Sequence, residues 1–283
     1  MPLGPLELYK LLPRTNCGDC HQPSCLAFAT QVVGNGYELR ECVHLDDGTL
    51  ADIERQLSVQ RQQGVFVKKD SHKITREHLQ EKIKEHDFCA IAPGLGIEFT
   101  QVDGEDALLI QYFDKKVILT HREIRLQVSG QLDPWDQVLL YNYIFFAGEK
   151  PLSTRWVGLE SFPNSLSKRA ALEEVCHRRI SSTFGGHMES LRTACLGLGG
   201  VESLEDNNAD LAYRFQALPK VPLLLLFWDE DKEEGFDSQT RILFDSVAKD
   251  YLDLEGLCFL AEKLVLRLLT KKEESKCREA KRI

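Results

Sequence analysis

Apolar residues recur at helical spacing in several parts of the chain. Near the start they predict a short helix around Leu8, which Pro13 ends, and a second helix over residues 25–33, which Gly-Asn-Gly at 34–36 stops. Farther along, the same spacing predicts helices over residues 135–146, 172–184 and 254–269. The intervening pattern is different, so the chain is not all-helical.

Residues that favour strands are concentrated in the middle of the chain. Three short runs, separated by Asp103-Gly104 and by the polar residues 114–116, predict an antiparallel meander over residues 97–102, 107–113 and 117–120. Residues 221–228 are continuously apolar and predict a buried strand, with which residues 241–244 could pair. Together with the helices, this pattern predicts an α+β fold with an antiparallel sheet.

The polarity of the chain divides it into four parts. Residues 1–45 form a small helical unit, and residues 46–86 are charge-rich and are interpreted as a helical connector whose charges face solvent. The larger α+β domain is expected over residues 87–269. Residues 270–283 are polar and are expected to form a frayed tail.

Composition narrows the class of protein. The 283 residues suffice for two domains, and 43% of them are apolar. A net charge of −9 makes the chain a poor non-specific binder of nucleic acid, so no nucleic-acid partner is expected. The longest apolar run falls far short of the roughly 18 residues that span a bilayer, and the start of the chain has no signal-peptide pattern. A cytoplasmic protein without a membrane span is therefore expected.

Four of the nine cysteines lie in the first 45 residues, and their spacing is C-x2-C-x4-C-x16-C over Cys17, Cys20, Cys25 and Cys42. An odd total with no export signal fits a reducing compartment, so metal ligation is favoured over disulfides. Three cysteines on one loop can hold three corners of a 4Fe–4S cluster, and Cys42 can return to the fourth. Cys25 would lie in the first turn of a helix, where the dipole favours an anionic cluster.

Structural zinc held by four cysteines is the competing interpretation of the same residues. Zinc sites usually present two separated CxxC pairs, whereas this chain has one, so the spacing fits the iron–sulfur cluster better.

His21 lies between the ligands and is interpreted as a loop residue that donates a hydrogen bond near the cluster. Gly18, which follows Cys17, gives the loop backbone conformational freedom, and Pro23 fixes φ close to Cys25.

The segment LPRTNCGDCHQPSCLAFATQVV with Cys42 resembles the iron–sulfur domain at the N-terminus of the corrinoid iron–sulfur protein large subunit, which also occurs in a subunit of membrane electron-transport complexes. The resemblance covers residues 6–45, and all four family ligands fall on the four cysteines. It implies a 4Fe–4S cluster that passes single electrons to a redox partner, which could be a corrinoid protein. The cobalamin-binding barrel of that family is not evident, so methyl-group transfer is not implied.

The larger region is similar to an uncharacterised prokaryotic domain that follows this cluster domain in other chains. The stretches that carry the similarity are YNYIFFAGEKPLSTRWVGLESFP, the FGG at 184–186 and the segment from ALPK to AKDYL at 217–252. No activity is implied. Two functions other than electron transfer stay open: an enzyme or accessory protein that handles a corrinoid or other cofactor with the cluster as reductant, and an interaction protein with a purely structural metal site.

The other cysteines give weaker signals. Cys89, Cys176, Cys195 and Cys258 are interpreted as core residues, and Cys277 lies in the polar tail with no assigned role. The acidic segment 229–237 follows the buried strand and is interpreted as a solvated hairpin loop. No nucleotide-binding motif is present, because the glycines at 197–200 lack the Lys-Ser/Thr of a phosphate loop.

Overall fold

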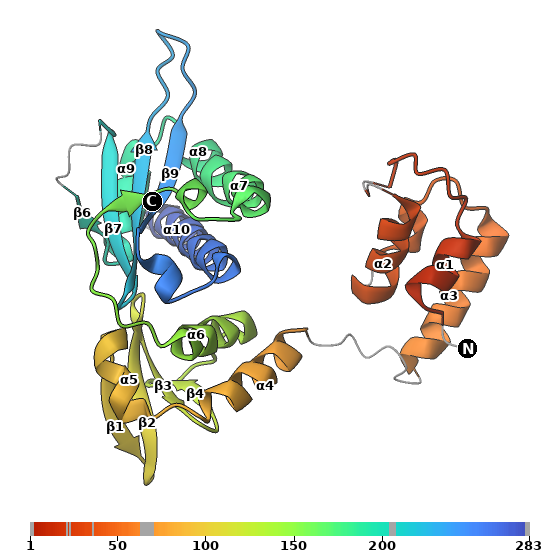
Figure 1. The fold of residues 1–283 in the computed structure, drawn as a ribbon. Helices are drawn as coiled ribbons and strands as arrows, with labels where there is room; N and C mark the ends of the chain where they lie inside the picture. Colours follow the sequence, from red (N-terminus) through yellow and green to blue (C-terminus); the bar gives the residue numbers. More distant parts are fainter. Residues whose placement is uncertain are drawn as a thin grey trace. The chain divides into compact units, whose positions relative to one another are not determined.

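A computed structural model describes residues 3–20, 22, 24–35, 37–62, 71–203 and 208–280 of the chain. These residues fall into two compact units, one within Met1–Thr75 and one within Arg76–Ile283. Figure 1 shows a helical first unit and a second unit that combines sheets with helices. The predicted α+β class, with an antiparallel sheet in the larger part, is confirmed.

The first unit is built from short helices around a small apolar core. Its elements are α1 (Pro5–Leu11), α2 (Cys25–Asn35), the 3₁₀ turn η1 (Leu39–Glu41) and α3 (Asp47–Gln62). Leu8 of α1 and Phe28 of α2 are almost fully buried, and Ile53 of α3 belongs to the same apolar cluster. The helix that begins in the charge-rich segment therefore packs on the helices around it, and its polar residues form the outer face.

The second unit begins on the helix α4 (Ser71–Ile83) and contains a four-stranded antiparallel meander. The strands follow in the order β1 (Glu98–Val102), β2 (Glu105–Tyr112), β3 (Lys115–Thr120) and β4 (Ile124–Leu126). Asp103 and Gly104, with φ of 53° and 79°, form the tight turn between β1 and β2, because Asp and Gly tolerate positive φ. The predicted meander is thus present, with β4 in addition.

Five further strands form the second sheet, in the spatial order β5-β9-β8-β7-β6 with every pair antiparallel. The predicted buried strand is β8, at the centre, and it pairs with β9 through Leu224↔Leu243. The strands are β5 (Trp156–Val157), β6 (Val201–Glu202), β7 (Leu211–Leu218), β8 (Val221–Trp228) and β9 (Gln239–Asp245).

Helices cover the second sheet on one side, where α7, α8, α9 and α10 stand beside it in Figure 1. One continuous apolar cluster runs from Leu79 to Leu268 and joins both sheets to these helices. The helical elements of this unit are α5 (Phe88–Leu95), α6 (Pro134–Phe146), η2 (Leu159–Ser161), α7 (Leu166–Leu172), a π-helical turn η3 (Glu173–His177), α8 (Arg178–Phe184), α9 (Met188–Gly197), η4 (Ala248–Asp250) and α10 (Leu254–Ala280).

Two helical details differ from the predicted pattern. The C-terminal helix continues past residue 269 to Ala280, so the polar segment from Thr270 is helical as far as that residue. The predicted helix over 172–184 is present, but a π turn interrupts it at Glu173–His177. Within the described residues, no helix is long and apolar enough to cross a membrane.

Helix α5 begins at a side-chain cap, which gives a first testable prediction. The Asp87 carboxylate accepts hydrogen bonds from the backbone N–H groups of Cys89 at 2.9 Å and Ala90 at 3.2 Å. We expect Asp87→Ala to lower the free energy of unfolding of this unit by about 1 kcal/mol, the usual cost of losing such a cap. Urea unfolding measures this, with exposed Glu85→Ala as the control; equal unfolding midpoints for the two variants would contradict it.

Candidate metal centre

Three separate pieces of chain bring the four N-terminal cysteines to one pocket. Cys17 and Cys20 lie on the loop between α1 and α2, Cys25 is the first residue of α2, and Cys42 ends the turn η1. All four line the same small hollow, which is partly open to solvent. The predicted ligands are therefore neighbours in space, although Cys17 and Cys42 are far apart along the chain.

Asn16 shapes the loop at the start of α2. Its backbone N–H points at the Cys25 Sγ, 3.4 Å away, and its side-chain Oδ1 accepts the Cys25 N–H at 2.9 Å. This exchange requires a positive φ of 51° at Asn16, a conformation that asparagine tolerates well. Ser24 accepts the Ala27 N–H at 3.1 Å and so caps the helix. The Cys25 sulfur consequently receives an N–H donor and lies at the positive end of the helix dipole.

The four cysteines differ in their access to solvent. Cys20 and Cys25 are each 7% exposed and Cys42 is 9% exposed, whereas Cys17 is exposed. Burial raises the pKa of the Cys42 thiol, and the three neighbouring cysteines raise it further. Four thiolates in one hollow would repel each other without a cation between them. The donor set therefore suits a positively charged metal group, which removes the thiol protons when it binds.

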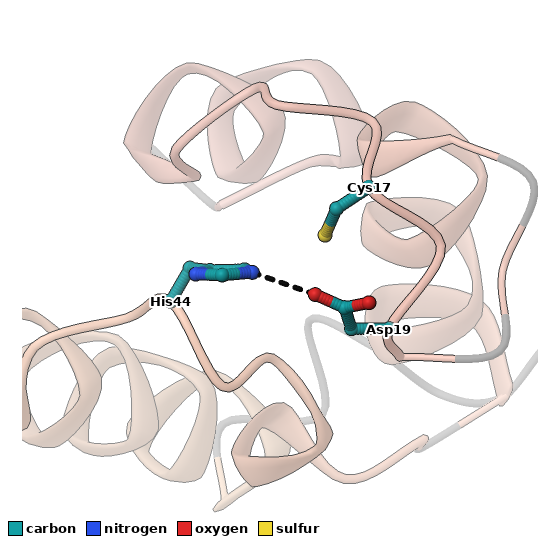
Figure 2. A group of neighbouring side chains, drawn as sticks. All are labelled: Cys17, Asp19 and His44. Carbon is teal, nitrogen blue, oxygen red and sulfur yellow. Dashed lines mark hydrogen bonds and ion pairs between the residues drawn. The ribbon is translucent and has the colours of Figure 1, made fainter.

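Two exposed side chains that line the pocket, His44 and Asp19, contact each other. His44 Nε2 lies 2.7 Å from Asp19 Oδ2, and Cys17 lies beside them, as Figure 2 shows. One ligand-type atom from each of these three side chains lies within 4.8 Å of the others. A hydrogen bond from His44, followed by one from Cys17, lowers the pKa of Asp19. Sequence reasoning missed both residues because no spacing rule links positions 25 apart.

A second contact ties the Cys20 loop to the segment before Cys42. The Tyr37 hydroxyl donates to the backbone carbonyl of Cys20 at 3.3 Å, and the Tyr37 ring packs edge-on against Phe28 with centroids 5.9 Å apart.

Three residues to which the sequence analysis gave roles lie outside the described residues: His21, Pro23 and Gly36.

The other cysteines whose side chains are described, Cys89, Cys176, Cys195 and Cys258, belong to the second unit. Cys176 and Cys195 are buried as predicted, and burial raises the pKa of each thiol, to about 12 for Cys176. Cys258 is partly buried, and its thiol pKa is raised to about 11 for the same reason. The prediction of a core position for Cys89 is wrong: it is exposed, because the Asp87 cap starts α5 with Phe88 facing the core and Cys89 facing solvent. The side chain of Cys277 lies outside the description.

Both units contain a region that matches a known family model. Residues 12–44 match the family model described as "Putative Fe-S cluster". A second model, described as "Domain of unknown function (DUF3786)", matches residues 87–267, well over half of the chain. The chain belongs to the DUF3786 family. Both resemblances drawn from the sequence are confirmed.

Relatives match the N-terminal region. The corrinoid/iron-sulfur protein large subunit of Moorella thermoacetica is 47% identical over 47 residues, which are 17% of this chain and 10% of the relative. The acetyl-CoA decarbonylase/synthase complex subunit gamma of Methanothermobacter thermautotrophicus is 36% identical over 58 residues, 20% of this chain and 13% of the relative. Subunit gamma 2 of that complex from Methanosarcina mazei is 49% identical over 39 residues, which are 14% of this chain and 8% of the relative.

The chain spans only about a tenth of the length of these curated relatives. The similarity therefore supports the Fe–S cluster domain and does not extend over the relatives' other domains. No solved structure matches the chain.

Within the DUF3786 domain, a small polar pocket lies around His177 in the π turn. The His177 Nε2 accepts the backbone N–H of Ile242 at 3.1 Å, and Nδ1 lies 2.9 Å from the Glu173 carboxylate. Burial lowers the pKa of His177. Both ring nitrogens thus have partners within the fold. His177 accepts a backbone N–H of β9 at a position with which the short strand β5 does not pair.

The acidic segment 229–237 connects β8 to β9 as predicted. Asp231 and Phe236 form a bridge across it, and Figure 1 shows the hairpin extending beyond the sheet. Trp156 and Trp228 pack on the apolar residues of the sheet face opposite the helices.

Proposed function

We propose that Cys17, Cys20, Cys25 and Cys42 hold one 4Fe–4S cluster and that this cluster transfers single electrons to a partner protein. The observation that carries the proposal is the convergence of four thiols from three chain segments on one pocket. The match of residues 12–44 to an Fe–S cluster family supports the same cofactor.

The residues around the pocket are suited to this role. A 4Fe–4S cluster supplies a site that takes up and gives back one electron, with a potential set by charge, burial and hydrogen bonds to sulfur. Asn16 offers one such N–H to the Cys25 sulfur, and the first turn of α2 favours the anionic charge. Because Cys17 is the exposed ligand, electrons would pass through its corner of the cluster.

The names of the matched relatives bear on the partner of the cluster. The relatives are named as a subunit of a corrinoid/iron-sulfur protein and as subunits of an acetyl-CoA decarbonylase/synthase complex. These names favour a protein partner, and a corrinoid protein is the candidate that we propose. The DUF3786 domain would dock this partner or hold the substrate being reduced, and the reducing cytoplasm would keep the cluster intact.

A direct redox titration tests the electron-transfer role. Anaerobically purified chain should absorb at about 400 nm, as such clusters usually do. About one electron equivalent of reductant per chain should bleach this absorbance. Reoxidation should restore the absorbance. A colourless, redox-silent preparation would contradict the proposal and favour a structural metal site. A tightly bound cobalt chromophore would instead support a cofactor-handling function.

A further inference from the structure

The hydrogen bond between Asp19 and His44 joins two of the three pieces of chain that carry the proposed cluster ligands. Asp19 lies on the loop between Cys17 and Cys20, and His44 follows Cys42 by two residues. Their side chains meet at 2.7 Å, and Figure 2 shows both directed toward each other beside Cys17. The pair thus connects the Cys17 loop to the Cys42 segment.

Among the described residues, the backbone bonds at Cys42 are local and do not make this connection. The Cys42 N–H donates to the Leu39 carbonyl, and the Cys42 carbonyl accepts the Leu45 N–H, both at 3.2 Å. They shape the turn that presents Cys42, but they join it only to its immediate neighbours. Side chains therefore make the ties to the cysteine loop: Tyr37 to the Cys20 carbonyl, and His44 to Asp19.

We propose that Asp19 and His44 are positioning residues that form a latch, which holds the Cys42 segment against the Cys17 loop and keeps the cluster in its pocket. This inference rests on the proposed function. When the latch opens, the exposed Cys17 corner and the Cys42 segment can separate, and iron becomes accessible to solvent. The latch acts on the rate at which the cluster is lost, because it opposes the first movement of that separation.

The Asp19 carboxylate has a second effect through its charge. It lies next to Cys17, with one atom of each of Cys17, Asp19 and His44 within 4.8 Å of the others. A negative charge at that position makes it harder to add an electron to the cluster, since net charge near the sulfurs sets the potential. Asp19 therefore keeps the reduction potential lower than a neutral residue would.

Release of iron to a chelator under anaerobic conditions tests the latch in the full chain. His44→Ala should lose iron about fivefold faster than the wild type, the size expected of one exposed charged hydrogen bond. His44→Gln, whose amide can still donate to Asp19, should stay within about twofold of the wild type. Asp52→Ala is the matched control, because it removes an exposed ion pair to Arg55 that lies within α3 alone.

The reduction potential separates positioning from mere support of the fold. Asp19→Asn keeps an oxygen that His44 can contact but removes the charge, so it should raise the potential while changing iron release little. Asp19→Glu should restore a potential close to that of the wild type. An unchanged potential in Asp19→Asn would overturn the charge effect, and iron release from His44→Ala at the wild-type rate would overturn the latch.

The two proposals fail in different ways. If the wild type itself binds no iron and sulfide, the proposed function fails. If the wild type holds its cluster and His44→Ala matches Asp52→Ala in every measurement, the latch fails and the proposed function stands.

Discussion

Replacement of Cys25 or Cys42 by alanine is expected to abolish cluster binding. Each change removes one of four thiols that line the pocket, and both side chains are buried there, so solvent does not easily supply a substitute ligand. We expect iron to fall from about four atoms per chain to less than about one, because a 4Fe–4S cluster is held by four thiolates. Iron and acid-labile sulfide, measured on anaerobically reconstituted protein, report the result.

Cys89→Ala is the matched control for these variants. Cys89 is an exposed thiol in the second unit, outside the pocket, and its loss should leave the iron content unchanged. The wild-type iron content in both Cys25→Ala and Cys42→Ala would refute the ligand assignment. Cys17→Ala should lose iron as well, since Cys17 lines the same hollow.

A second large effect is expected at Asp245, a carboxylate that is 1% exposed at the end of β9. It accepts hydrogen bonds from the Ser153 N–H at 3.2 Å, the Ser153 hydroxyl at 2.7 Å, the Thr154 N–H at 2.8 Å and the Val247 N–H at 3.0 Å. Thr154 has a φ of 57°, which is unusual for a β-branched residue, and the carboxylate holds it there. Asp245 thus fixes the segment before β5 to the sheet.

Asp245→Asn should lower the free energy of unfolding of the second unit by about 3 kcal/mol. The asparagine side chain has an NH2 group in place of one carboxylate oxygen. Its hydrogens face backbone N–H groups, and some of these backbone N–H groups are then buried without an acceptor. Tryptophan fluorescence during urea unfolding reports on this unit selectively, because Trp135, Trp156 and Trp228 all lie within it. Exposed Asp237→Asn is the control. The prediction is refuted if both variants unfold at the wild-type midpoint.

The sequence was most informative where local spacing decides the structure. The C-x2-C-x4-C loop and the helix after it could be predicted because turn residues and helical periodicity are local signals. The meander followed from β-formers interrupted by Asp103-Gly104. Strand β8 was found because a short, continuously apolar run favours a buried strand.

Other features depend on tertiary contacts or give conflicting local signals. Helix α5 contains Pro93 and Gly94, which argue against a helix, yet the Asp87 cap and the left-handed Gly96 define both of its ends. The partners Asp19 and His44 meet only because the chain folds back after α2. Cys89 looked like a core residue from composition, and the capped start of α5 turns it outward.

One measurement tests the central claim most directly: iron, zinc and acid-labile sulfide determined together on the full chain, prepared without oxygen. The account predicts about four iron and about four sulfide per chain with little zinc, since a cubane carries equal numbers of both. One zinc per chain with no sulfide would contradict it, because the four thiols would then hold a structural ion that carries no electrons.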